Sequence, residues 1–229
     1  MVFGEIVEPS SRAFLDDESI DFPEYESPEF RWTNKLEIFS DIDSIVFTET
    51  KRINELFEKI ILHNYVLVNS LNNCLNLYKR EHSLIAVYKE PKVTEDKLTT
   101  GQIVEALEPF LKKIKQIYTI TSSTLMSYCE KSKKKENLEC FVESLSTKNS
   151  YNFGVRKLIA PNLISGLGSN IFSYCIYNNL ICSSFIFYLN NTPPDSINSK
   201  PIIELAKNMC LSPNSFSTRM TAPIHNLYM

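Results

Sequence analysis

Apolar and polar residues follow two different periods along the chain, and the first clear pattern begins at residue 36. Residues 36–42 and 44–48 show the alternation or short apolar runs that are typical of strands. Residues 53–61 then place apolar side chains three and four positions apart, as an amphipathic helix does, whereas residues 63–68 return to strand character. This region therefore carries both helix and strand signals, and the pattern alone leaves it ambiguous.

A buried strand and a capped helix are predicted next. Residues 83–88 are almost entirely apolar and Pro91 follows them, which is typical of a strand that ends before a proline. Residues 100–113 carry one apolar stripe at helical spacing, and we expect Thr100 to cap the N-terminus of this helix. Pro109 lies inside the stripe and is expected to kink or split the helix.

The second half of the chain repeats the order strand, helix, strand, helix, at residues 116–122, 165–179, 181–189 and 200–209. β-Branched residues dominate the first of these strands. The helix at residues 165–179 is expected to turn one face to the core, which carries Leu167, Ile171, Phe172, Cys175 and Ile176. We therefore predict an α/β fold in which helices flank a central mixed sheet as a layered sandwich.

Composition and charge divide the chain into a core and two ends. Of the 229 residues, 43% are hydrophobic and 22% are charged, as in an ordinary globular protein with one sizeable domain or two small ones. The first thirty residues hold nine Asp or Glu against Arg12, a net charge of −8, although the whole chain carries only −3. Because like charges repel, we expect a flexible acidic arm at residues 1–33, an α/β core at 34–211 and a tail at 212–229.

Hydropathy and cysteine usage predict a cytoplasmic protein without a membrane span. The longest apolar run, residues 180–189, is half the length of about 20 residues that a spanning helix needs. The first residues lack the basic and apolar segments of a signal peptide. Six scattered cysteines without a C-x-x-C pair are expected to be buried free thiols: Cys74, Cys129, Cys140, Cys175, Cys182 and Cys210. Nuclear or endoplasmic-reticulum association remains an alternative location.

Motifs for catalysis, metal binding and nucleic-acid binding do not stand out. His63, His82 and His225 lie far apart, the sequence has no G-x-S-x-G, and no Cys or His spacing matches a zinc site. Residues 131–135 include four lysines, but one basic cluster without interleaved aromatic residues is more typical of a solvated loop. We predict no enzymatic activity, no cofactor, no metal and no nucleic-acid partner.

One helix start has two readings. Gly166, Leu167 and Gly168 open the helix predicted at residues 165–179, and helix N-termini attract anions such as phosphate. The third glycine and the preceding strand of a dinucleotide fingerprint are missing. We therefore expect these glycines to serve close packing at the helix start.

The ending of the chain is its most informative local feature. Leu227, Tyr228 and Met229 form a hydrophobic-tyrosine-X sequence that places a rigid aromatic anchor next to a terminal carboxylate. Such an ending also occurs by chance, and a terminus without a partner is ordinarily frayed. The motif therefore needs support from other parts of the chain.

Three separated segments supply that support, because they resemble proteasome assembly chaperone 1 proteins of animals. Residues 2–13 (VFGEIVEPSSRA), followed by acidic residues, are similar to the start of that family. Residues 158–191 are similar to its block of Pro-Asn, a helix, Ser-Tyr-Cys and an apolar strand, and the tail resembles its hydrophobic-tyrosine-X ending. Residues 50–150 match poorly, so the resemblance covers about a third of the chain.

The resemblance implies a chaperone of 20S proteasome assembly. It implies a heterodimer with a proteasome assembly chaperone 2-like subunit on the proteasome α-type subunits, where the pair scaffolds the α-ring. Leu227, Tyr228 and Met229 would then enter a pocket between α subunits, with the Met229 carboxylate on a lysine. We further hypothesise a second contact from the N-terminal arm, through Phe3, Gly4, Glu5 and Arg12.

Two other functions remain as alternatives. A nucleoside-phosphorylase-like enzyme has similar α/β layers but needs a phosphate site and a base pocket, and the sequence indicates neither. A proteasome-binding activator or adaptor could use the same C-terminal motif, although the sequence lacks the G-x-x-x-x-G-K-[ST] of a P-loop ATPase.

Overall fold

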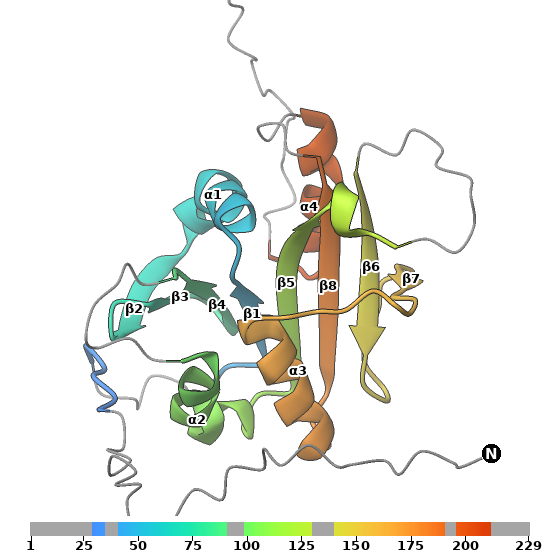
Figure 1. Cartoon of the computed structure of the whole chain (residues 1–229). Helices are drawn as coiled ribbons and strands as arrows, with labels where there is room; N and C mark the ends of the chain where they lie inside the picture. Colours follow the sequence, from blue (N-terminus) through green and yellow to red (C-terminus); the bar gives the residue numbers. More distant parts are fainter. Residues whose placement is uncertain (1–28, 35–40, 91–98, 130–139, 191–195, 212–229) are drawn as a thin grey trace, which may run out of the picture.

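The structure is a computed structural model that describes residues 29–34, 41–90, 99–129, 140–190 and 196–211, with residues 196–198 described by their backbone alone. Within these residues, eight strands form one mixed sheet and four α-helices cover its two faces (Figure 1). The predicted α/β sandwich is therefore confirmed. The strands are β1 (Ser44–Thr48), β2 (Val66–Leu71), β3 (Leu75–Arg80), β4 (Ser83–Tyr88), β5 (Gln116–Thr124), β6 (Cys140–Ser146), β7 (Arg156–Lys157) and β8 (Cys182–Leu189).

The strands lie in the order β2-β3-β4-β1-β5-β8-β6-β7. Strand β1 pairs in parallel with β4 and β5, and β5 pairs in parallel with β8, so these four strands end at one edge of the sheet. The pairs β2–β3, β3–β4 and β6–β8 are antiparallel. Every residue of β8 is buried, as expected for a strand covered on both faces, and this explains its long apolar run.

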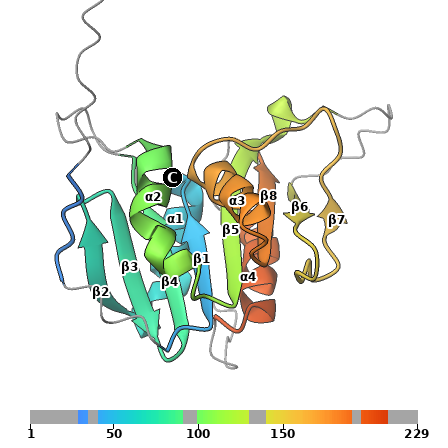
Figure 2. The same ribbon diagram turned by 90° about the horizontal axis from the view of Figure 1, so that it is seen from below.

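Two helices pack on each face of the sheet (Figures 1 and 2). The helices are α1 (Lys51–Ile60), α2 (Thr100–Leu111), α3 (Leu167–Tyr177) and α4 (Ser196–Asn208). Because side chains alternate along a strand, Ile45 and Phe47 of β1 enter the core beneath α2 and α3, whereas Val46 enters the core beneath α1 and α4. The sheet therefore separates two apolar cores.

The helix predicted at residues 53–61 is confirmed as α1, and the helix predicted at 100–113 as α2. The cap assigned to Thr100 is wrong by one residue. The Thr99 hydroxyl accepts a hydrogen bond from the Gln102 backbone N–H, and the Gln102 side chain accepts one from the Thr99 N–H. This reciprocal pair is a capping box. Pro109 lies in the last turn and does not split the helix, which continues to Leu111.

Two further predictions need correction. Ile176 was expected on the inner face of α3 but is 57% exposed, because it lies one position past the buried stripe that ends at Cys175. The strand predicted from residue 63 begins only at Val66, after the 3-10 turn η2 (Leu62–Asn64). Strands β3, β6 and β7 were not predicted. The strand predicted at residues 36–42 lies mostly outside the described residues.

All six cysteines are free, but they are not all buried. Cys74, Cys175 and Cys182 are buried, whereas Cys129 and Cys210 are exposed and Cys140 is intermediate. The expectation of buried thiols is therefore wrong for the exposed pair, which lie in a loop and after a helix, not in apolar strands. Among the described residues, no helix has both the length and the apolar character that crossing a membrane requires.

The end of the described chain is anchored to β3. The Arg80 guanidinium of β3 donates hydrogen bonds to the backbone oxygens of Cys210 and Leu211, at 3.2 and 3.1 Å. Arg80 also lies over the Tyr65 ring, 5.1 Å from its centre. Leu211 is itself fully buried. These contacts hold the residues that follow α4 against β3, next to the edge strand β2.

Candidate functional site

The residues predicted to bind the proteasome lie outside the described residues. They are Leu227, Tyr228 and Met229 in the tail, and Phe3, Gly4, Glu5 and Arg12 in the N-terminal arm. Their role stays a prediction. The lysine cluster at residues 131–135 also lies outside the described residues.

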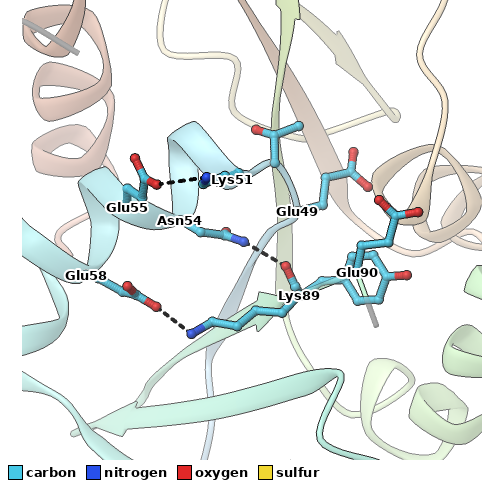
Figure 3. A pocket seen from close by; sticks show the side chains of 9 residues that line it. Glu49, Lys51, Asn54, Glu55, Glu58, Lys89 and Glu90 are labelled. Carbon is cyan, nitrogen blue, oxygen red and sulfur yellow. Dashed lines mark hydrogen bonds and ion pairs between the residues drawn. The ribbon is translucent and has the colours of Figure 1, made fainter. Parts of the chain in front are cut away.

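A cavity of about 590 Å³ opens where β1 and β4 end, beside the first turns of α1 (Figure 3). Its size falls within the range of about 300–1,000 Å³ that small-molecule pockets occupy. Four glutamates and two lysines line it, together with Thr50, Asn54 and Tyr88. The cavity therefore carries more negative than positive side chains.

Glu49 forms the inner wall of this cavity and reaches the start of α3. Its Oε2 accepts a hydrogen bond of 3.0 Å from the Gly168 backbone N–H. The N-terminus of a helix presents unpaired N–H groups and a partial positive charge, which offset part of the cost of burying this carboxylate. Burial raises the pKa of Glu49, and the Gly168 N–H opposes that shift. The chain thus places its own anion where a phosphate would otherwise bind.

The two glycines make room for this carboxylate. A Cβ added to Gly166 would lie 2.7 Å from Glu49 Oε2, and one added to Gly168 would lie 3.2 Å from Oε1. Gly166 also has φ +84°, a conformation that other residues adopt only with strain. The predicted packing role of Gly166 and Gly168 is therefore confirmed.

Asn54 of α1 fixes the wall between the helix and β4. Only 6% of the residue is exposed, and its Nδ2 donates a hydrogen bond of 2.7 Å to the Tyr88 backbone oxygen. Because a carbonyl oxygen needs a donor, this contact fixes the orientation of the amide. Asn54 Oδ1 is then buried without a hydrogen-bond partner among the described residues.

The lysines of the cavity are already engaged by acids at its rim. Lys89 Nζ lies 2.7 Å from Glu58 Oε1, and Lys51 Nζ lies 4.0 Å from Glu55 Oε1. The bond to Glu58 raises the pKa of Lys89. Pairs as exposed as these contribute at most about 1 kcal/mol to stability. Their main effect is to leave Glu49 and Glu90 as the uncompensated charges of the cavity.

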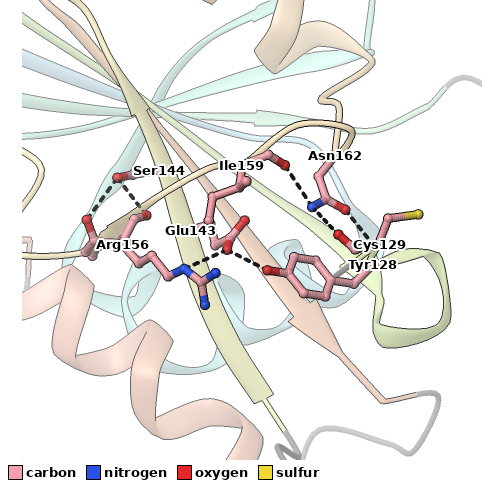
Figure 4. Close-up of polar contacts among 8 residues, drawn as sticks. Tyr128, Cys129, Glu143, Ser144, Arg156, Ile159 and Asn162 are labelled. Carbon is pink, nitrogen blue, oxygen red and sulfur yellow. Dashed lines mark hydrogen bonds and ion pairs between the residues drawn. The ribbon is translucent and has the colours of Figure 1, made fainter. Parts of the chain in front are cut away.

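A second glutamate, Glu143, lies in β6, three strands along from β1 in the strand order (Figure 4). The side chain of Glu143 in β6 is fully buried, and its Oε1 lies 3.5 Å from Arg156 Nε. The same oxygen accepts a hydrogen bond of 2.9 Å from the Tyr128 hydroxyl. Tyr128 also packs edge-on against Phe141 and Tyr188. This arrangement joins a loop and two strands around one charge.

Beside that ion pair, the side chain of Asn162 forms two hydrogen bonds with the backbone of Cys129. Asn162 accepts a hydrogen bond from the Cys129 N–H at 2.8 Å, and its Nδ2 donates to the Cys129 backbone oxygen at 3.0 Å. The link ties the loop after β5 to the loop before α3. Met126 and Leu163 within these loops are 89% and 86% exposed. The link therefore orders a surface that carries two apolar side chains.

The described residues fit ligand or protein binding better than phosphate chemistry. Glu49 occupies the N-terminus of α3, and the cavity beside it carries excess negative charge, so a phosphate would meet repulsion. In the described part of the chain, no three His, Cys, Asp or Glu side chains are grouped to hold a metal ion. Sequence reasoning missed Glu49 and Asn54, because the Glu49–Gly168 contact joins positions 119 residues apart.

Comparison with known proteins gives matches at the level of structure. No family model matches the sequence, and no curated protein matches it. PbaA of Pyrococcus furiosus, described as an archaeal homologue of proteasome-assembly chaperone, superposes with a TM-score of 0.56 at 10% identity, over 82% of this chain and 83% of its own. At this identity the likeness establishes a shared fold.

Two further solved structures share that fold. PbaB of Pyrococcus furiosus, described as an archaeal proteasome activator, gives a TM-score of 0.53 at 10% identity, over 81% of this chain and 91% of its own. A protein of unknown function from Thermoplasma acidophilum gives 0.55 at 14% identity, over 76% and 77%. The structural neighbours thus include one protein described as a homologue of proteasome-assembly chaperone and one described as a proteasome activator.

Proposed function

We propose that this protein is an assembly chaperone of the 20S proteasome that works as a heterodimer with a related subunit. The observation that carries the proposal is the hydrophobic-tyrosine-X ending on a chain whose fold is shared with a proteasome-assembly chaperone homologue. The ending alone occurs by chance and the fold alone hosts several functions. Their combination supports proteasome binding.

The tail supplies the contact with the α-ring. The carboxylate of Met229 pairs with a lysine between two α subunits, Tyr228 packs and hydrogen-bonds in the groove, and Leu227 fills its apolar wall. One such tail binds weakly. A partner subunit with a similar tail makes the second contact intramolecular and raises the overall affinity by about 10² to 10⁴. Heterodimerisation is therefore part of how the chaperone holds the ring.

The residues at the sheet edge support a binding protein in preference to the enzyme alternative. A nucleoside-phosphorylase-like reaction needs a phosphate held by cations or helix N–H groups. Here Glu49 occupies the start of α3, and two of the four cavity glutamates have no ion-pair partner among the described residues. A protein that only scaffolds other subunits needs no phosphate site, so the negative charge of the cavity does not conflict with that function.

An activator of the mature proteasome is the second candidate, because the fold is also shared with PbaB. An assembly chaperone binds α-rings and precursor particles, whereas an activator binds finished 20S particles. The proposal assigns this chain to the precursors. The population of proteasome that it binds therefore separates the two functions.

The test is affinity purification of the tagged chain from its own cells, followed by mass spectrometry. We expect the wild type to bring down a related α/β subunit, α-type subunits and unprocessed β subunits. Deletion of residues 227–229 should lose the α subunits at least about tenfold and retain the partner. Met229→Ala is the matched control, since it keeps Leu227, Tyr228 and a terminal carboxylate, and should bind like the wild type.

Two outcomes contradict the proposal. Recovery of mature 20S particles without precursors assigns the chain to the activators, and absence of α subunits from every variant removes the proteasome altogether. The tail mechanism also requires that Met229 carry the free carboxylate, which the intact mass of the endogenous protein tests. Deletion of residues 1–14 tests the second contact from the arm, which is wrong if α-subunit recovery is unchanged.

A further inference from the structure

The cavity beside α1 has an unused hydrogen-bond acceptor at its wall. Asn54 is 94% buried from solvent by the surrounding chain, with 6% exposed, and its Nδ2 is committed to the Tyr88 oxygen. Its Oδ1 has no donor among the described residues. A buried acceptor without a donor costs about 1–3 kcal/mol, so such atoms ordinarily have a partner or a function. A ligand with an N–H donor would satisfy Asn54.

The charges of the cavity point to the same kind of ligand. Its two lysines are paired with Glu55 and Glu58, and within the described ranges Glu49 and Glu90 have no ion-pair partner (Figure 3). The two unpaired carboxylates leave the cavity with a net charge of −2. A cation is therefore attracted and an anion is repelled.

The oxygen acceptors that line the cavity distinguish between classes of cation. A divalent metal ion needs several oxygen ligands around one point, and the described residues hold no group of three acidic or imidazole side chains that could provide it. A primary ammonium is compact, carries three donors, and can bond an amide oxygen and a carboxylate at once. The rim already shows this chemistry, since Lys89 Nζ lies 2.7 Å from Glu58.

We propose that this cavity binds an aliphatic primary ammonium group, with Glu49 and Asn54 as its inner acceptors and Glu90 at its mouth. The group is carried by a free polyamine or by the lysine side chain of a bound protein. The volume of about 590 Å³ has room for either chain. The proposal concerns a site at the carboxyl edge of β1 and β4, and it is independent of the C-terminal tail.

The test is a titration of the full-length ¹⁵N-labelled chain, followed by NMR at constant ionic strength. Spermidine and N-acetyl-lysine methylamide represent the two sources of the ammonium. We expect saturable shifts at the backbone amides of residues 49–58 and 88–90, with dissociation constants near or below about 1 mM. Tetramethylammonium, which carries the same single charge as the lysine derivative but no N–H donor, should bind at least about tenfold more weakly than that derivative. Inorganic phosphate should not bind.

Three variants localise the site. Glu49→Gln should weaken spermidine about tenfold, because it removes the charge from a hydrogen-bonded inner acceptor. Glu90→Gln, at an exposed position that does not endanger folding, should weaken it about threefold. Glu105→Gln on α2, an exposed glutamate on the other face of the sheet, is the matched control and should bind like the wild type.

Any of three results overturns the proposal. These are no saturation up to about 20 mM of either amine, equal binding of tetramethylammonium, or equal effects of the Glu49, Glu90 and Glu105 substitutions. Stronger binding of spermidine than of the lysine derivative assigns the site to a free polyamine, and the reverse assigns it to a protein. A chain without residues 227–229 should bind the amines unchanged, so this test and the test of proteasome binding can fail separately.

Discussion

The molecule holds two glutamates in different ways: Glu49 follows β1 and is partly buried, whereas Glu143 lies within β6 and is fully buried. Glu143 is fully enclosed, and a cation and a phenol both bond its Oε1. Glu49 has no cation beside it and is held by the Gly168 N–H at the start of a helix, next to an open cavity. The enclosed carboxylate is committed to holding strands and loops together. The Glu49 carboxylate beside the cavity keeps one oxygen, Oε1, without a hydrogen-bond partner among the described residues.

The largest expected effect comes from removing the partner of the enclosed carboxylate. Arg156→Ala leaves Glu143 buried with only Tyr128 as a donor, and breaking such a pair should lower the free energy of unfolding by about 3 kcal/mol. Lys157→Ala is the control, since Lys157 is the exposed neighbour in the same strand. Urea denaturation measures both. A loss below about 0.5 kcal/mol for Arg156→Ala would mean that the ion pair does not hold this side of the sheet.

An intermediate effect is expected where Glu49 docks. Gly166→Ala should cost about 2 kcal/mol, because a Cβ there collides with Glu49 Oε2 and the residue has φ +84°. Gly154→Ala is a matched control, since Gly154 has φ +74° but no atom within 4 Å of its Cβ position. The excess cost at Gly166 measures the Glu49 contact alone. That excess should disappear in a Glu49→Ala background, and persistence there contradicts the docking of Glu49.

The smallest expected effect is the change in stability when the charge of each glutamate is removed, which should have opposite signs at Glu49 and Glu143. Burial raises the pKa of Glu49 above its ordinary 4.5, so the folded state takes up a proton more readily than the unfolded state. The charged form therefore destabilises the fold above that pKa, and stability recovers as the pH falls through it. Glu49→Gln should stabilise the protein at neutral pH by up to about 1 kcal/mol, and this gain should shrink toward pH 4.5.

Glu143→Gln should act in the opposite direction at neutral pH, because it weakens the bonds from Arg156 and Tyr128. Thermal unfolding of both variants between pH 4.5 and pH 8 makes the comparison. If both substitutions stabilise or both destabilise at neutral pH, the two carboxylates are not held in the different ways that their surroundings indicate.

Local patterns were sufficient to predict the elements whose apolar positions match the faces that they bury. The apolar run of β8 and the stripe of α2 are confirmed because each is buried on the faces that its period indicates. Strand β7 was missed since it is two charged residues that pair with β6 through the backbone. Strand β6 was missed because Glu143 interrupts its apolar pattern, and this glutamate is held there by Arg156 and Tyr128.

The candidate site was less predictable than the fold. Gly166 and Gly168 were recognised as a tight helix start, but the group that they accommodate could not be identified. Glu49 follows directly after a buried strand, which is a usable signal in a parallel sheet, since the ends of such strands gather at one edge. Its bond to Gly168 depends on strand order, which no local pattern contains. The predicted tail residues stay a prediction.

The hydrogen bonds from Arg80 to Cys210 and Leu211 limit how far from the sheet the end of the chain can reach. Leu211 is a fixed origin, and the eighteen residues that follow it to Met229 can span at most about 60 Å when fully extended. Under the proposed tail mechanism, the pocket that receives Tyr228 would lie within that radius of Leu211. If the tail binds as proposed, adding or removing residues between Leu211 and Leu227 should alter how often residues 227–229 meet their pocket. The contacts made in the pocket should stay the same.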